Sequence, residues 1–154
     1  MLMSKYRLTE DRVREMDRNM ETMAAAEGLE YHLTEKGQSG NTLDAHRLVH
    51  LAASHECEDQ MLERLYKAYF TDQRSVFDVE SLVSLAVEEG LDATEVREAL
   101  ESDRYVDAVR RDLEEARMLG VTGVPFFVID GRYGISGAQA TEVFTRALVM
   151  ACQA

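Results

Sequence analysis

The sequence predicts an α/β protein that is mostly α-helical and ends in a ββα unit. Across residues 42–119, apolar residues recur three and four positions apart with brief breaks between segments, a pattern typical of successive amphipathic helices. After Gly120, the apolar run Val124–Ile129 is followed by Asp130-Gly131, a dipeptide that favours a tight type I′ turn between two strands. A return strand over Tyr133–Ser136 and a last helical pattern complete the ββα unit.

The N-terminal segment predicts one helix and one short extended piece. Thr9 can cap a helix that Gly28 ends, and its apolar residues Val13, Met16, Met20 and Met23 share one helical face. A methionine stripe of this kind more often packs in a core than binds a ligand. Residues 29–33 then alternate apolar and polar side chains, which predicts a short strand or an extended segment.

Five short helices are predicted between Thr42 and Gly120, and they form a compact helical insert. Capping residues and glycines mark their limits. Thr42 and Asp78 begin the first and third helices, Gly90 ends the third, and Asp103 begins the fifth. Asp92 followed by Glu95 predicts a capping box at the fourth. The domain organisation is therefore 1–41 (N-terminal helix and extended segment), 42–119 (helical insert) and 120–154 (ββα unit).

Size and charge exclude several classes of function. The 154 residues suffice for one domain that carries an insert. A formal net charge of −12 repels phosphate backbones and anionic lipid, so we expect neither nucleic acid nor a membrane as partner. No apolar run approaches the ~20 residues needed to span a bilayer, and no signal peptide is visible. We therefore expect a cytoplasmic protein.

Pro125 is the one proline in the chain and stands at the start of the apolar strand. Proline cannot donate a hydrogen bond to a sheet, so a strand start suits it without any further role. The sequence around Pro125 favours a functional role as well. A helix, the turn from Gly120 to Gly123, Val124-Pro125, an apolar strand, a tight turn and a last helix follow in order. This arrangement resembles the C-terminal half of thioredoxin-fold proteins, in which a cis proline precedes a strand.

Four ordered blocks sharpen the resemblance. They are Asn41–Leu48, Leu65–Phe70, Gly120–Tyr133 and Ser136–Gln139, and together they resemble the DsbA-like, FrnE-type thiol–disulfide oxidoreductases. That family implies a DsbA-type thioredoxin-like fold interrupted by a helical insert, of which the ββα part is present here. The resemblance also implies a disulfide or thiol peptide as substrate, bound at Thr122, Gly123, Val124 and Pro125. It also places His46 where the insert meets the thioredoxin half, as a fifth substrate-binding residue.

The chain departs from this family in one respect that decides the expected chemistry. Family members hold a Cys-x-x-Cys pair in an N-terminal βαβ unit, and these 154 residues contain no such pair. We therefore expect no catalytic residue here and a redox-inactive chain that lacks the first βαβ unit. A lone two-stranded hairpin is marginal in water and leaves an apolar edge open. This predicts a homodimer that completes a shared sheet.

Two other functions remain open. Kappa-type glutathione transferases and 2-hydroxychromene-2-carboxylate isomerases share the inserted thioredoxin plan and bind glutathione beside the proline loop. A non-catalytic peptide-binding or assembly module could use the open hairpin edge instead.

The positions of the cysteines and histidines predict neither a disulfide bond nor a metal site. Cys57 and Cys152 are far apart in sequence, so two free thiols are predicted. His46, His50, His55 and Cys57 include residue types that suit zinc, yet short histidine pairs on helices are usually packing or surface residues. We expect no metal and no cofactor.

Overall fold

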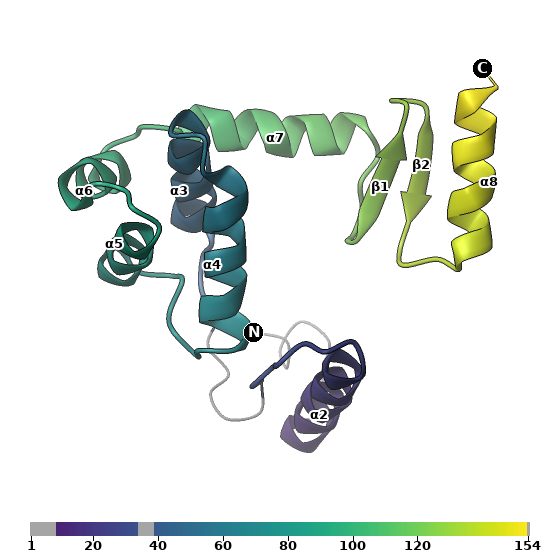
Figure 1. Cartoon of the computed structure of the whole chain (residues 1–154), viewed down its shortest axis with the longest axis horizontal. Coiled ribbons are helices and arrows are strands. Elements are labelled where there is room, and N and C mark those ends of the chain that lie inside the picture. Colours follow the sequence, from purple (N-terminus) through teal and green to yellow (C-terminus); the bar gives the residue numbers. More distant parts are fainter. Residues whose placement is uncertain (1–8, 34–38, 154) are drawn as a thin grey trace. The chain divides into compact units, whose positions relative to one another are not determined.

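A computed structural model describes residues 9–33 and 39–153 (Figure 1). Parts of the predicted N-terminal segment, residues 1–8 and 34–38, lie outside the described residues. The elements are α2 (Glu10–Ala26), α3 (Leu43–Ser54), α4 (Glu58–Phe70), α5 (Val79–Glu88), α6 (Ala93–Glu101), α7 (Val106–Met118), β1 (Phe126–Ile129), β2 (Tyr133–Ser136) and α8 (Thr141–Cys152). The chain divides into two compact units, Met1–Val109 and Arg110–Ala154, so the division falls within α7.

Aspartate and threonine caps begin several helices as predicted. Thr9 accepts a hydrogen bond from the N–H of Arg12 at the start of α2. Asp78 accepts from the N–H of Ser81 at 2.9 Å. Hydrogen bonds from the Ser75 hydroxyl and the Ser81 N–H hold the pKa of Asp78 below its usual value. The mostly helical fold predicted from periodicity is confirmed, including the five helices of the insert.

Three details of the predicted helix starts are wrong. Thr42 occupies the cap position of α3, but its side chain makes no capping bond, and Asn41 Oδ1 accepts from the Leu43 N–H at 2.9 Å instead. Asp92 caps α6, yet the Glu95 carboxylate does not complete a capping box because it binds His55 and Arg104. The fifth helix begins at Val106, three residues later than predicted.

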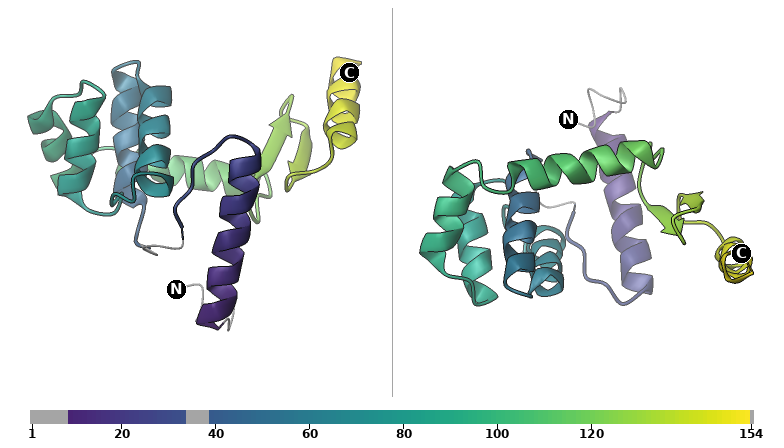
Figure 2. Two further views of the ribbon diagram at one scale, coloured as in Figure 1. Left: turned by 60° about the horizontal axis from the view of Figure 1, so that its bottom comes forward. Right: turned by 90° about the horizontal axis from the view of Figure 1, so that it is seen from above.

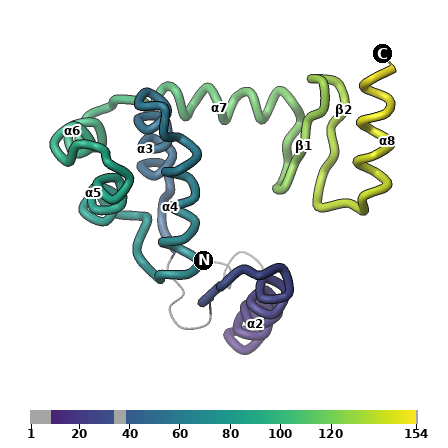
Figure 3. The backbone as a smooth tube through the Cα atoms, in the orientation of Figure 1, coloured from purple at the N-terminus to yellow at the C-terminus, as the bar shows by residue number. Residues whose placement is uncertain are grey.

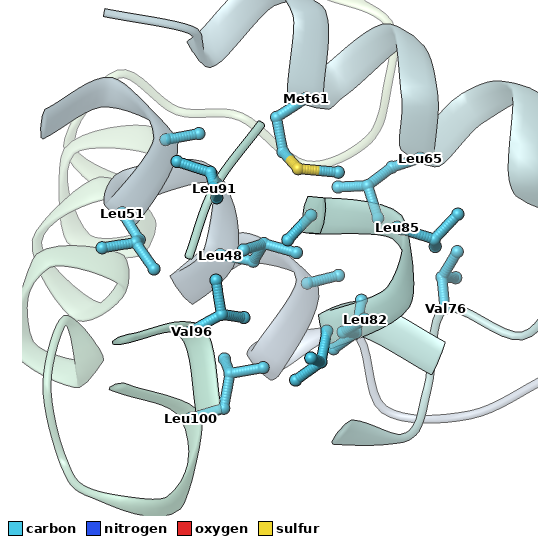
Figure 4. Close-up of a cluster of buried hydrophobic side chains, with 14 of the residues drawn as sticks. Leu48, Leu51, Met61, Leu65, Val76, Leu82, Leu85, Leu91, Val96 and Leu100 are labelled. Atoms are coloured by element: carbon cyan, nitrogen blue, oxygen red, sulfur yellow. The ribbon is translucent and has the colours of Figure 1, made fainter. Parts of the chain in front are cut away.

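An apolar core joins α3, α4, α5 and α6, whose chain path can be followed in Figure 3. Leu48, Leu51, Met61, Leu82 and Leu85 are fully buried. The close-up shows these side chains of α3, α4 and α5 converging, together with Val96 and Leu100 of α6 (Figure 4). Burial of a leucine or methionine side chain contributes about 1.5–3 kcal/mol relative to exposure. This core makes the helical insert a unit with its own interior.

Arg47 is a charged residue buried in this unit, with 5% of its surface exposed. Its guanidinium donates to the backbone carbonyls of Ala99, Leu100, Ser102 and Arg104 and to the Asp44 carboxylate. The bonds to Leu100 and Arg104 measure 3.0 and 2.9 Å. The last carbonyls of a helix lack partners within the helix and attract a cation. Arg47 of α3 therefore satisfies the C-terminal end of α6.

The N-terminal helix α2 differs from the prediction in its methionine stripe. Met16, Met20 and Met23 are 46%, 49% and 66% exposed, so the expectation that they pack in the core is wrong. Ala24 is the buried residue of this helix. Residues 29–33, which follow α2, form no strand. There Tyr31 stacks on Phe70 with ring centroids 4.6 Å apart, and the His32 N–H donates to the Phe70 carbonyl at 2.7 Å.

The second unit contains the β-hairpin and α8. β1 and β2 pair antiparallel, with Phe127 opposite Ile135. The turn has positive φ at Asp130 (54°) and Gly131 (62°), and the Arg132 N–H donates to the Ile129 carbonyl at 3.1 Å, the features of the predicted type I′ turn. Helix α8 lies alongside the hairpin (Figure 2). Phe127 and Phe144 meet edge to face there, with centroids 4.9 Å apart.

Among the described residues, no helix combines the length and apolar character needed to cross a membrane.

Candidate substrate-binding site

The loop from Gly120 to Pro125 connects α7 to β1. Helix α7 ends where Gly120 adopts a positive φ of 74° and the Val121 N–H returns to the Ala116 carbonyl at 3.0 Å. The peptide bond between Val124 and Pro125 is cis. Strand β1 begins at Phe126 rather than at Val124, because Val124 and Pro125 belong to the loop. The Pro125 carbonyl accepts from the Gly137 N–H at 2.8 Å, which ties the loop to the end of β2.

The loop presents free backbone groups. Thr122, Gly123 and Val124 make no hydrogen bond to any of the described residues, and the Val124 side chain is 90% exposed. Backbone N–H and C=O groups need a hydrogen-bond partner, either in the protein or in water. Three successive residues just before a strand that have no partner in the described protein can therefore exchange hydrogen bonds with a second chain.

One face of the hairpin is held by α8, and the other carries Phe126 and Val128. The Phe126 ring lies across Gly134 of β2, where a Cβ would come within 3.0 Å of it. Val128 is 40% exposed. In the described part of the chain, the sheet has two strands, so the outer edge of β1 has no neighbouring strand. An extended segment could continue the sheet at this edge.

The structure brings four of the predicted site residues together and leaves the fifth in the other unit. Thr122, Gly123, Val124 and Pro125 form one continuous loop. His46 lies on α3 in the helical unit, where it is exposed and borders an apolar pocket. This pocket was not predicted from the sequence. The available signal was the aromatic spacing of Tyr66, Tyr69 and Phe70 along one helical face.

The cysteines and the remaining histidines are dispersed. Cys57 and Cys152 are free thiols, as predicted. Cys57 lies at the cap position of α4 and its Sγ–H points to the Ala52 carbonyl at 3.5 Å. His55 pairs with Glu95 at 3.0 Å, and His50 stacks on Tyr105. Within residues 9–33 and 39–153, no three His, Cys, Asp or Glu side chains are arranged to hold a metal ion.

The helical insert contains a network of charged groups that joins its elements. Glu88 of α5 receives hydrogen bonds from Arg74 and Arg64, both at 2.7 Å, and these two guanidiniums hold the pKa of Glu88 below its usual value. Arg64 also lies 2.9 Å from Asp72. This network joins α4, α5 and the connection between them, which is a structural role.

The fold and the loop together define a class of protein. A ββα unit with a cis proline before its first strand, preceded by a helical insert, is the arrangement of thioredoxin-fold oxidoreductases of the DsbA type. Comparison with known families agrees. The model of the DSBA-like thioredoxin domain matches residues 3–149. The chain belongs to this family.

Individual relatives support the assignment. The crystal structure of a probable DsbA oxidoreductase from Streptomyces coelicolor is similar over 99% of this chain and 66% of its own chain, with 48% sequence identity and a TM-score of 0.89. An uncharacterized protein from Bacillus subtilis, YwbO, is 30% identical over 131 residues, which is 84% of this chain and 65% of YwbO. The chain thus spans about two thirds of the length of these relatives.

Proposed function

We propose that this chain supplies the substrate-holding part of a thiol–disulfide oxidoreductase. A cysteine-containing peptide substrate lies extended along residues 122–124 and exchanges backbone hydrogen bonds with them. Its strand direction continues along the outer edge of β1. This is recognition by strand addition, in which the backbone provides affinity and side-chain pockets provide selectivity.

The observation that carries the proposal is the free backbone of Thr122, Gly123 and Val124 beside an open strand edge. Membership of the DSBA-like family makes a thiol or disulfide peptide the substrate class that best suits this loop. The proposal includes redox inactivity of these 154 residues by themselves, because their two cysteines stand 95 positions apart, in different units.

A peptide titration tests the binding site. The probe is an eight-residue peptide of alternating valine and serine with one S-methylated cysteine, which cannot undergo disulfide exchange. We expect amide chemical-shift changes in NMR spectra to concentrate at Thr122, Gly123 and Val124. Replacement Thr122→Pro removes one N–H donor and should weaken binding about tenfold, the effect of losing one hydrogen bond of about 1.4 kcal/mol.

The matched control is Thr122→Ala, which keeps the N–H and should bind the peptide as the wild type does. Equal weakening by both variants would show that the side chain, and not the backbone, makes the contact. Peptide binding without shifts in the loop would refute the proposed site. Shifts of the same amides on titration with glutathione, and none with the peptide, would favour the glutathione-binding alternative.

A second candidate function is assembly through the ββα unit. Val128, Val143, Leu148, Val149 and Met150 are each 40–53% exposed there. Residues 120–154 hold two acidic and two basic residues (Asp130, Glu142, Arg132 and Arg146), so the formal charge of −12 resides entirely in the rest of the chain. Two copies of this unit can therefore approach without net repulsion. We propose a homodimer formed by this surface.

Sedimentation equilibrium at micromolar concentration tests the homodimer. We expect twice the mass of 17.4 kDa for the wild type and the monomer mass for Val128→Lys, because a lysine on an edge strand opposes strand pairing. The control is Val87→Lys on α5, where the side chain is 48% exposed in the helical unit, and it should remain dimeric. A monomeric wild type would contradict the assembly candidate and leave the peptide site unaffected.

A further inference from the structure

The helical unit contains an apolar pocket that the proposed peptide site does not use. Its volume is about 400 Å³, and it lies between α3, α4 and the connection from α4 to α5. Ala45, Val49, Leu62, Leu65 and Val76 line its apolar walls. No Asp, Glu, Lys or Arg is among the described residues that line it. The volume is within the range of about 300–1,000 Å³ typical of small-molecule sites.

One wall of this pocket is aromatic and held in a fixed arrangement. The Tyr69 ring meets Phe70 edge to face, with centroids 4.9 Å apart and planes at 83°. It meets Phe77 in the same way at 5.8 Å and 86°. Tyr31 stacks on the far side of this group against Phe70. In such contacts the positive edge of one ring meets the negative face of another. A further aromatic ring can pack against this wall in the same way.

Gly40 allows Phe77 to pack directly against the backbone. A Cβ at residue 40 would lie 2.6 Å from Cγ and 2.8 Å from Cβ of Phe77, closer than van der Waals contact permits. Phe77 thus occupies the space that any other residue at position 40 would need. The aromatic wall is therefore formed before a ligand arrives, which lowers the entropic cost of binding.

One border of the pocket is polar. Thr42 and His46 are four positions apart at the start of α3, so both lie on the same helical face. Their side chains form no hydrogen bond to the rest of the described chain. A hydroxyl and an imidazole can each donate or accept a hydrogen bond. A ligand that fills the apolar part of the pocket could place one polar group here.

We infer that this pocket binds a small uncharged aromatic molecule that carries one hydroxyl or carbonyl group. The ring packs against Tyr69, Phe70 and Phe77, and the polar group hydrogen-bonds to His46 or Thr42. The lining offers no cation to pair with an anion, and the net charge of −12 opposes one. It also offers no carboxylate to a cationic ligand. This inference is independent of the proposed peptide function, because it uses the helical unit and needs no thiol.

Three naphthalene compounds test the inference by calorimetric titration at pH 7. We expect 2-naphthol to bind with a Kd below about 1 mM, which corresponds to about −4 kcal/mol, and 2-naphthoate to bind at least tenfold more weakly. Naphthalene itself should bind more weakly than 2-naphthol to the wild type. In NMR spectra, 2-naphthol should show contacts to the rings of Tyr69, Phe70 and Phe77.

Two variants locate the site. Thr42→Trp should fill the mouth of the pocket and abolish 2-naphthol binding; the Thr42 side chain makes no capping bond, so its loss removes no helix contact. His46→Leu should remove the preference for 2-naphthol over naphthalene, while His55→Leu, outside the pocket, should preserve it. If Thr42→Trp does not fold, Tyr66→Ala, at an exposed position of the wall, should weaken binding severalfold. Equal affinity for all three compounds, or binding that survives these changes, would overturn the inference.

Discussion

Replacement of Arg47 by methionine is expected to lower the free energy of unfolding by about 3–5 kcal/mol, because several backbone carbonyls lose a buried charged donor. The substitution removes the Arg47 donor from four backbone carbonyls at the end of α6 and in the turn after it, of which the Ala99 carbonyl keeps a hydrogen bond from the Ser102 hydroxyl. Each buried acceptor left unsatisfied costs about 1–3 kcal/mol. The same change leaves the Asp44 carboxylate without its cation. Urea denaturation followed by circular dichroism measures the loss.

Two further variants separate this mechanism from simple loss of charge. Arg47→Lys keeps the charge, but an ammonium group cannot reproduce the planar set of donors, so we expect most of the destabilisation to persist. Arg97→Met removes an arginine that forms an exposed ion pair with Glu80; such pairs contribute little, and stability should hardly change. If Arg47→Lys were as stable as the wild type, the carbonyl contacts would not be the source of the stabilisation.

The case of Arg47 illustrates which parts of the fold a sequence can predict. Helix starts at Asp78 and the hairpin turn at Asp130-Gly131 depend on residues a few positions apart, and both were predicted correctly. The carbonyls that Arg47 satisfies lie 52–57 positions away in sequence. No local pattern encodes such a pairing. A basic residue on an amphipathic helix is normally expected at the surface.

The positive φ angle of Tyr105 could not be predicted from the sequence either. Tyr105 adopts a φ of 66°, in the left-handed region that bulky residues rarely occupy. Its hydroxyl bonds to Ser54 at 3.2 Å, and its ring lies against His50. These tertiary contacts explain why α7 begins at Val106 and not at Asp103. A capping pattern cannot reveal them.

The loop and the pocket also differ in whether the sequence predicts them. The loop Thr122–Pro125 was predicted because its residues are consecutive and its position between a helix and an apolar strand is itself a sequence feature. The pocket of the helical unit was not predicted, because Phe77 contacts both Gly40 and Tyr69 only in the folded unit. His46 was predicted from family resemblance. Its free side chain beside an aromatic wall is visible only in three dimensions.

The 154-residue chain is expected to show no turnover in the reduction of insulin by dithiothreitol above the rate without protein. Disulfide exchange proceeds through a mixed disulfide, and a second thiol nearby in the same chain resolves it faster than free dithiothreitol does because that attack is intramolecular. Cys57 is partly buried at the start of α4 and Cys152 is exposed at the end of α8. The two belong to different units, and neither has a second cysteine within three positions. Precipitation of reduced insulin, followed as turbidity, measures the rate.

Single-cysteine variants test which of the two thiols reacts. Cys152→Ala should leave a chain that forms almost no mixed disulfide with a small aromatic disulfide, because the Cys57 thiol packs against the core and points to a carbonyl. Cys57→Ala should form a mixed disulfide at the exposed Cys152, which mass spectrometry detects as an adduct, yet still show no turnover. Activity that survives Cys152→Ala and disappears in Cys57→Ala would make Cys57 a catalytic thiol.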